Sequence, residues 1–255
     1  MTRRSLALIK ALVLFCCLTP LGLLIARASG LGDLGANPVQ EVLHTLGKTG
    51  LNLILLTLTI TPIRKGTGLN WLVGLRRTLG LSAFGYILLH ATTYAVLDQG
   101  LAWSSLLVDV TQRPYITFGF LGLVLMVPLA VTSTNAMQRR LGRKWSQLHR
   151  LVYLIGILGV THFFWQVKID VSEPLLYGAV LSLLLGYRAV GWFKKHFGLS
   201  LLRSTWTVEY AGVKAKGQER NQVIAVLRRI WALPFIFHFD FVDEATGSVV
   251  MTSER

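Results

Sequence analysis

The sequence predicts an all-α polytopic membrane protein: a domain of six transmembrane helices over residues 1–200, followed by a short extension over residues 201–255. Hydrophobic residues make up 53% of the 255 residues and charged residues only 15%, and the mean hydropathy is +0.54. A soluble domain of this length would carry more charge on its surface. The apolar residues gather into six runs, and most Lys and Arg residues lie in short clusters between them.

Each apolar run is close to the roughly 20 residues that a helix needs to cross a hydrocarbon core. We expect these helices near 7–27, 45–63, 79–97, 115–132, 148–166 and 174–193. The first run follows a basic start and ends near "ARA" at 26–28, which resembles a signal-peptide cleavage site. Its apolar stretch is too long for a typical signal peptide and the helix count is even, so we favour a retained anchor. No internal repeat is evident along the chain.

The charged residues alternate between successive connections. Acidic residues occupy the first, third and fifth connections: Asp33, Glu41, Asp98, Asp109, Asp170 and Glu173. Basic residues occupy the other connections and both ends: Arg3, Arg4, Arg64, Lys65, Arg76, Arg77, Arg139, Arg140, Arg143, Lys144, Lys194 and Lys195. The positive-inside rule then places both termini in the cytoplasm. A net charge of +14 would also suit a nucleic-acid-binding protein, but this placement between apolar runs predicts no nucleic-acid partner.

The extension at 201–255 has a different pattern. Phe235, Phe237, Phe239 and Phe241 recur at every second position of "FIFHFDFVD", which is the period of a β-strand. We therefore expect a cytoplasmic, β-rich or partly disordered extension and no seventh crossing. His196, just before this extension, and His238 within it are interpreted as solvated surface residues.

Two histidines are expected at similar depth in the bilayer. His90 lies 11 residues into the third helix and His162 lies 14 residues into the fifth, which are about 17 and 21 Å at 1.5 Å per residue. Ionisable groups at membrane depth usually point into the bundle and are functional. Two imidazoles on parallel helices can hold one flat disc between them, and haem iron with two histidine ligands is a one-electron carrier. The alternative is a pair of buried histidines that bond to nearby threonine hydroxyls.

His149 and His44 are harder to interpret. His149 lies 13 residues before His162, about 20 Å nearer the inner surface and about 220° around a straight helix. It suits a second haem site, but the third helix offers Arg76 and Arg77 at that depth in place of a histidine. The alternative for His149 is a helix-start residue at the interface. His44 opens the second helix at the outer surface and is most simply interfacial.

Several stretches resemble the MsrQ (YedZ) family, whose members are haem-binding membrane subunits within the ferric-reductase-like transmembrane superfamily. The resemblance covers about residues 7–195. It rests on "LGANPVQEVLHTLGKTGLNLILLTLTITPI", "RRTLGLSAFGYILLHATTYAVLD", "RPYITFGFLGL" and "TSTNAMQRRLGRKWSQLHRLVYLIGILGVTHFFWQVK", and on the spacing of His90, His149 and His162.

The resemblance implies cofactors, partners and a location. It implies that His90, His149 and His162 bind one or two b-type haems in a multi-pass protein of the bacterial inner membrane. It also implies that electrons pass from membrane quinols to MsrP, a periplasmic molybdopterin enzyme that reduces methionine sulfoxide in oxidised proteins. FMN is attributed to the family, without a site that can be assigned here. The segment 204–255 matches nothing in the family, and is either an added docking module or a disposable extension.

Three classes of function remain open from the sequence. The first is a membrane electron-transfer subunit with no substrate-reducing site of its own. The second is a self-sufficient transmembrane reductase of ferric iron or another small acceptor. The third is a transporter that binds a divalent metal through His90 and His162. No HExxH or GxxxxGK[ST] motif points to another chemistry.

Overall fold

The computed structural model describes residues 2–196, 205–210, 213–219, 238–243, 246 and 248–254. The chain divides into two compact units, residues 1–185 and residues 186–255. Six helices are long and apolar enough to cross a membrane: Arg4–Leu31, Pro38–Thr67, Asn70–Asp98, Pro114–Val131, Arg143–Gln166 and Ser172–Phe193. The predicted class, an all-α polytopic membrane protein with six spans, is confirmed.

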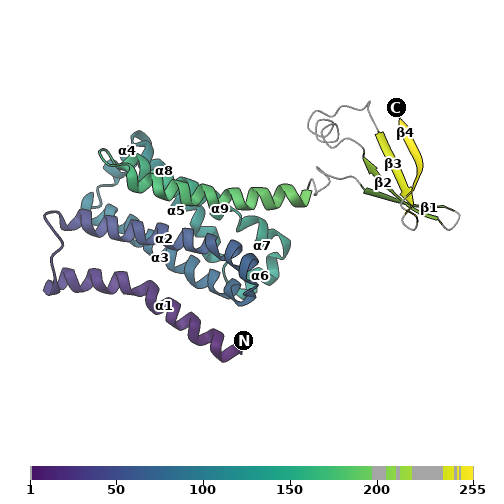
Figure 1. Cartoon of the computed structure of the whole chain (residues 1–255). Helices are drawn as coiled ribbons and strands as arrows, with labels where there is room; N and C mark the ends of the chain where they lie inside the picture. Colours follow the sequence, from purple (N-terminus) through teal and green to yellow (C-terminus); the bar gives the residue numbers. More distant parts are fainter. Residues whose placement is uncertain are drawn as a thin grey trace. The chain divides into compact units, whose positions relative to one another are not determined.

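Successive long helices of the first unit run in alternating directions (Figure 1). Their bounds are α1 Arg3–Ala26, the π-helix η1 Arg27–Leu31, α2 Pro38–Thr67, the 3₁₀-helix η2 Asn70–Leu75, α3 Arg76–Thr93, the π-helix η3 Tyr94–Asp98, α4 Trp103–Gln112, α5 Pro114–Val131, α6 Asn135–Leu141, α7 Arg143–Leu148, α8 Leu151–Gln166 and α9 Ser172–His196. Each end of the bundle is named after a short helix. The α4 end is the one where α2 begins and where α3 and α8 finish. The opposite end is the α6 end.

The second span starts earlier than its hydropathy predicted. Asn37 caps α2, because its side chain accepts a hydrogen bond from the Gln40 amide at 3.2 Å, and Pro38 occupies the first turn. The helix ends before Gly68, whose φ of +74° suits glycine. Our expectation of a start near residue 45 was therefore wrong by seven residues, and His44 lies in the second turn of α2.

The fifth span is not one continuous helix. His149 and Arg150 form a turn between α7 and α8, where the Arg150 amide bonds to the Gln147 carbonyl. The angle of about 220° that we derived for a straight helix therefore does not describe His149. The connection at 99–113 also differs from the simple loop expected, because it contains α4.

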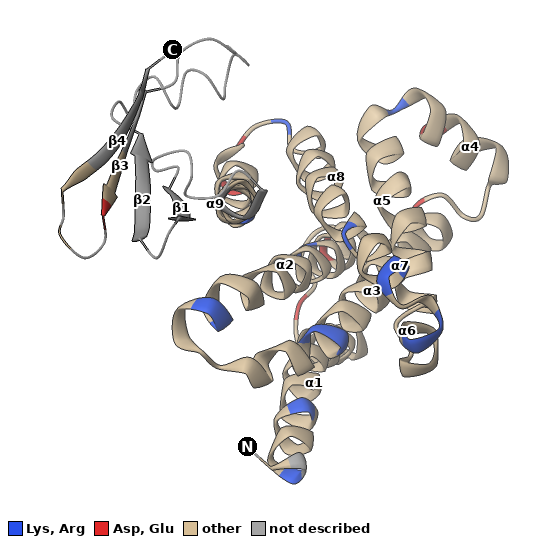
Figure 2. Ribbon diagram, turned by 90° about the vertical axis from the view of Figure 1, so that its right-hand side faces the viewer, with Lys and Arg blue, Asp and Glu red and all other residues tan. Residues whose placement is uncertain are grey.

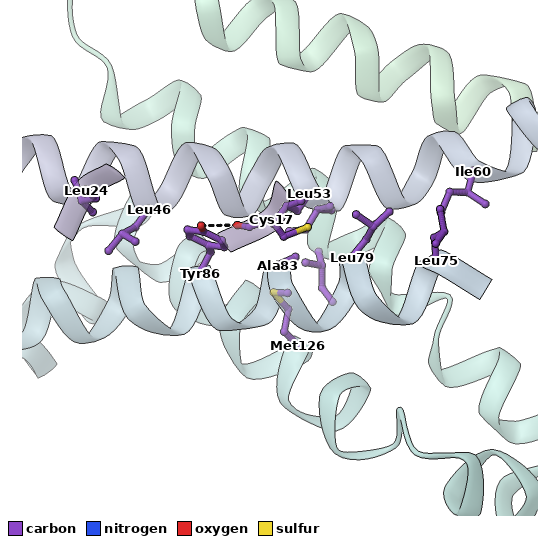
Figure 3. Packing of buried hydrophobic residues seen from close by; sticks show 12 residues of the cluster. Cys17, Leu24, Leu46, Leu53, Ile60, Leu75, Leu79, Ala83, Tyr86 and Met126 are labelled. Atoms are coloured by element: carbon purple, nitrogen blue, oxygen red, sulfur yellow. Dashed lines mark hydrogen bonds between the residues drawn. The ribbon is translucent and has the colours of Figure 1, made fainter. Parts of the chain in front are cut away.

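The largest core joins α1, α2 and α3 (Figure 3). Tyr86 of α3 is 3% exposed, and its hydroxyl donates to the Cys17 carbonyl at 2.6 Å. The same hydroxyl accepts from the Leu21 amide at 3.0 Å. A second cluster packs Leu181 and Leu184 of α9 against α2.

The second unit contains a four-stranded antiparallel sheet. Its strands are β1 Thr205–Tyr210, β2 Val213–Glu219, β3 His238–Asp243 and β4 Val249–Glu254, in that order across the sheet. The predicted β-rich extension is confirmed, and β3 overlaps the expected strand. Phe235 and Phe237 lie outside the described residues.

Charges separate between the two ends of the bundle. Figure 2 views the α6 end, where blue Lys and Arg ribbons mark the adjacent ends of α2 and α3 and the short helices α6 and α7. All six acidic residues of positions 2–196 lie at the opposite, α4 end or in the connections there. One of them, Asp170, precedes α9, and hydrogen bonds from the Ser172 hydroxyl and amide lower the pKa of its carboxyl.

Candidate metal centre

His90 of α3 and His162 of α8 face each other inside the bundle. Their ring centres are 6.1 Å apart and their planes are 81° to one another. Both residues are partly buried. The structure therefore brings together the two histidines that were expected at matched depth.

Each of these rings is fixed by a backbone carbonyl of a neighbouring helix. His90 Nδ1 lies 2.9 Å from the Leu43 carbonyl oxygen, and His162 Nδ1 lies 2.7 Å from that of Tyr115. A carbonyl oxygen can only accept, so each Nδ1 carries the hydrogen and donates it. In the neutral ring, Nε2 is then the unprotonated atom whose lone pair can bind a metal.

A glycine allows each ring to reach its carbonyl. A Cβ on Gly47 would lie 3.1 Å from His90 Nδ1, and a Cβ on Gly119 would lie 2.9 Å from His162 Nδ1. Contacts this short essentially force a shift of the ring or the helix. The alternative in which threonine hydroxyls satisfy the two histidines does not describe their Nδ1 atoms, because backbone carbonyls take that role.

The two halves of the site have the same construction. In each half the carbonyl residue precedes the glycine by four positions and the histidine by 47: Leu43, Gly47 and His90, then Tyr115, Gly119 and His162. The second set lies 72 positions after the first. The helix pairs α2–α3 and α5–α8 are therefore two copies of one antiparallel hairpin at this site, although we saw no internal repeat in the sequence.

Few residues are identical between the two copies of this repeat. Around the glycines, "LHTLG" at 43–47 corresponds to "YITFG" at 115–119, and only the threonine and the glycine agree. The equal spacing from glycine to histidine was the available signal, and the glycines were not among our expected site residues. Most of the repeat is carried by backbone geometry, which tolerates many side chains.

His149 lies apart from this pair, at the α6 end. Its ring stacks on Trp145 with centres 3.9 Å apart, and its Nδ1 lies 3.1 Å from the Trp145 carbonyl oxygen. The Trp145 indole in turn donates to the Thr132 carbonyl at 2.9 Å. His149 Nε2 is buried and has no hydrogen-bond partner among the described residues. A buried nitrogen without a hydrogen-bond partner is unfavourable unless a ligand binds it.

The residue that corresponds to His149 in the first hairpin is Arg77, 72 positions earlier. Arg77 donates to the Asn135 side chain at 3.0 Å, and the adjacent Arg76 donates to the Thr61 hydroxyl at 2.8 Å. The two hairpins thus share one histidine position and differ at the other.

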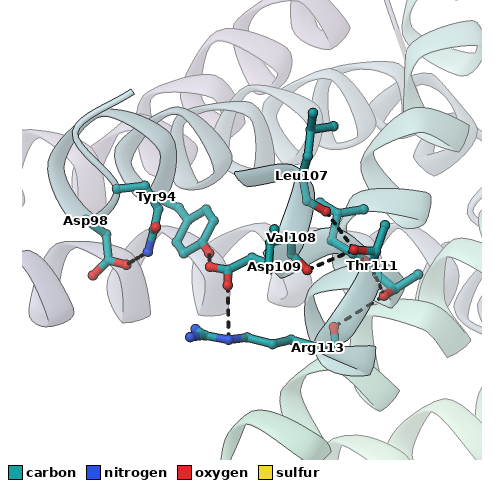
Figure 4. Close-up of polar contacts among 10 residues, drawn as sticks. Tyr94, Asp98, Leu107, Val108, Asp109, Thr111 and Arg113 are labelled. Atoms are coloured by element: carbon teal, nitrogen blue, oxygen red, sulfur yellow. Dashed lines mark hydrogen bonds and ion pairs between the residues drawn. The ribbon is translucent and has the colours of Figure 1, made fainter. Parts of the chain in front are cut away.

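A network of polar contacts lies at the α4 end of the bundle (Figure 4). Tyr94 of η3 donates to Asp109 of α4, a carboxylate that is only 6% exposed. Arg113 pairs with the same carboxylate at 3.1 Å. Asp109 was expected only as an acidic residue of a connection, and it is buried where it contacts Tyr94 and Arg113.

Within the part of the chain that the structure describes, no three His, Cys, Asp or Glu side chains gather to hold a metal ion. Protein sites for divalent metals usually supply three or four such ligands. The His90–His162 pair suits a metal whose other ligands come from a prosthetic group.

Comparisons with known proteins agree on one family. The model of the family "Ferric reductase like transmembrane component" matches residues 46–160. A relative from Xanthomonas campestris pv. campestris (strain 8004) is 45% identical over 195 residues, which cover 74% of this chain and 89% of the relative. One from Ralstonia nicotianae (strain ATCC BAA-1114 / GMI1000) is 49% identical over 157 residues, or 60% of this chain and 72% of the relative. Both are called "Protein-methionine-sulfoxide reductase heme-binding subunit MsrQ".

Proposed function

The chain belongs to the MsrQ family of haem-binding subunits of protein-methionine-sulfoxide reductases, and from this membership we propose that it is a membrane electron-transfer subunit. Its electrons come from membrane quinols. They leave to a periplasmic molybdopterin enzyme of the MsrP kind, which reduces methionine sulfoxide in oxidised proteins. The observation that carries this proposal is the pair of facing imidazoles at His90 and His162.

His90 and His162 are the proposed axial ligands of a b-type haem. A bond between a metal and an imidazole nitrogen is about 2 Å long, so two imidazoles on opposite sides of one ion have ring centres roughly 6 Å apart. The observed 6.1 Å agrees with this spacing. Because both Nδ1 atoms donate to carbonyls, both Nε2 atoms are free to act as ligands.

When bound, haem supplies a one-electron couple. The residues of the chain set the conditions for it. The Leu43 and Tyr115 carbonyls hold the two rings in one tautomer and orientation, so the ligands need not rearrange between oxidation states. With His90 and His162 both bound to it, the metal would have no open position for a substrate, which would favour electron transfer.

His149 is the proposed ligand of a second haem at the α6 end. Its buried and unpartnered Nε2 supports this assignment, because Trp145 fixes the ring so that this nitrogen faces away from the Trp145 carbonyl. Arg77 stands where a second histidine would complete the repeat, and we assign no residue as the other axial ligand.

The proposed orientation places the α6 end and both termini in the cytoplasm of a bacterium, with the protein in its inner membrane. The basic residues of the α6 end support this orientation through the positive-inside rule. The His90–His162 pair is then nearer the periplasm, where the partner enzyme receives the electrons. FMN is a further cofactor by family resemblance, and we assign it no residues.

Reconstituted electron transfer tests the proposed function. The purified protein in lipid vesicles is expected to show a low-spin b-type spectrum that a quinol reduces, and a periplasmic molybdopterin methionine sulfoxide reductase should reoxidise it. Reoxidation by ferric iron alone, with no response to that enzyme, would instead support the self-sufficient ferric reductase that the family model's name suggests. A preparation without haem would contradict both.

A further inference from the structure

His44 of α2 and Gln166 of α8 meet at the α4 end of the bundle. The Nε2 atoms of the two side chains are 3.3 Å apart. Both residues are partly buried, and Gln166 is the last residue of α8. The pair therefore bridges α2 and α8 at the α4 end of the bundle.

This pair lies just beyond the two facing histidines. Gly47, which contacts the His90 ring, is three residues after His44, and His162 is four residues before Gln166. Those separations correspond to about 4.5 and 6 Å along the two helices, both toward the α4 end. Residues three or four apart also share one face of a helix, so both side chains line the same side of the site.

The pair has unused hydrogen-bond donors. In the tautomer with the hydrogen on His44 Nε2, this N–H and a Gln166 amide hydrogen are both donors, and neither nitrogen can accept from the other. Two donor nitrogens 3.3 Å apart can reach the oxygens of one carboxylate, so the pair suits a ligand with negatively charged oxygens.

We propose that His44 and Gln166 bind a propionate carboxylate of the haem that His90 and His162 hold. This inference rests on the proposed function, because the carboxylate belongs to that haem. His44 and Gln166 contribute no ligand to the iron. Their hydrogen bonds would hold the haem toward this end of the bundle and would partly neutralise its carboxylate.

The other half of the repeat explains why the carboxylate is assigned to His44 and Gln166. The residues 72 positions away from this pair are Ile116, which has no polar side chain, and Tyr94. The Tyr94 hydroxyl already donates to Asp109, and Arg113 pairs with the same carboxylate. That half therefore contains a carboxylate of its own and offers a second one less attraction.

Single substitutions test the proposal on the intact protein. We expect His44→Leu and Gln166→Leu to keep the low-spin spectrum, since both iron ligands remain. Each should shift the propionate bending band in the resonance Raman spectrum and lower the midpoint potential, because a less neutralised carboxylate disfavours the added electron. Loss of a hydrogen bond to a charged group should also speed haem transfer to apomyoglobin about ten-fold. His44→Gln retains a donor and should restore most of the wild-type values.

Gln40→Leu is the matched control, since this residue is one turn further from the site on α2 and, within the described part of the chain, its side chain hydrogen-bonds to Asn37. It should leave the band, the potential and the transfer rate unchanged. If His44→Leu folds poorly, Gln166→Glu gives the same test, because a second carboxylate should accelerate haem loss. Wild-type values in all of these variants would overturn the inference while leaving the proposed function intact. Retention of the haem in His90→Ala would instead contradict the proposed function.

Discussion

Gly47 and Gly119 determine how closely α2 and α5 approach the two histidine rings. A backbone carbonyl has two lone pairs, so the Leu43 and Tyr115 oxygens can accept a helix hydrogen bond and a histidine hydrogen together. The helix hydrogen comes from the residue four positions later, which is the glycine in both cases. A side chain at that position would occupy the space that the ring needs.

Gly119→Ala is the residue-scale prediction. The new Cβ would meet His162 Nδ1 at 2.9 Å and Cε1 at 3.0 Å, so the ring must move away from the Tyr115 carbonyl. We expect haem content to fall several-fold and the remaining spectrum to lose low-spin character. Haem per protein and the absorbance spectrum of the purified protein measure this.

Gly122→Ala on the same helix is the control. Its Cβ would lie 3.8 Å from the Leu158 side chain, an ordinary contact, so haem content should stay near wild type. Equal haem content in the two variants would contradict the role assigned to Gly119.

Some residues of the candidate site could be predicted from the sequence, and others could not. Depth along two parallel helices was enough to pair His90 with His162. Depth says nothing of backbone acceptors, so Leu43, Tyr115 and both glycines were not expected. His44 looked interfacial because hydropathy placed the start of its helix too late, whereas Asn37 and Pro38 begin it two turns earlier.

At the scale of the elements, a hydroxyl of α3 hydrogen-bonds to the backbone of α1, in addition to the apolar packing between the two helices. Pro20 has no amide hydrogen and disturbs the bonding of α1 at this level. One residue on, the Tyr86 hydroxyl lies between the Leu21 amide and the Cys17 carbonyl, which would otherwise bond to each other across a helical turn. A side chain inserted in this way is a recognised cause of helix bending. Tyr86 is also one turn from His90, so this contact ties the first span to the helix that carries a proposed ligand.

Tyr86→Phe should destabilise the protein by about 1–3 kcal/mol, because two backbone groups lose a partner where water is scarce. Thermal unfolding in detergent, followed by tryptophan fluorescence, measures the change. Thr92→Val on α3 is the matched control, since the Thr92 hydroxyl donates only within its own helix, to the Leu88 carbonyl. It should change stability by less than about 0.5 kcal/mol. A Tyr86→Phe protein as stable as wild type would show that the α1 helix closes without the hydroxyl.

The six spans followed from hydropathy, whereas two details of the elements did not. Residues 103–112 are too few to span a membrane, yet they form the helix α4, whose Asp109 contacts Tyr94 and Arg113. The break at His149 depends on local hydrogen bonds that an apolar run does not reveal.

For the whole molecule, the separation of charge sets the proposed orientation. In positions 2–196 every acidic residue belongs to the α4 end, and the clusters of basic residues belong to the α6 end. Reporter fusions after Thr67 and Thr134 should therefore report a cytoplasmic location, and a fusion after Gly100 a periplasmic one. A reversed result at any of the three sites would contradict this orientation and the direction of electron flow that follows from it.

The fold class was predictable at this scale because the bilayer demands long apolar helices. The β-rich character of the extension followed from a single alternating stretch, part of which forms β3. The repeat of α2–α3 in α5–α8 was not predictable from residue identity, since helices in lipid tolerate almost any apolar side chain.

The central claim is that His90 and His162 share one haem while His149 belongs to another site. Haem content and redox spectra of the three single alanine variants test it directly. We expect His90→Ala and His162→Ala to lose the same low-spin component, because each leaves only one ligand on the iron. His149→Ala should keep that component. If His90→Ala and His149→Ala abolish the same component while His162→Ala leaves it intact, the pairing is wrong.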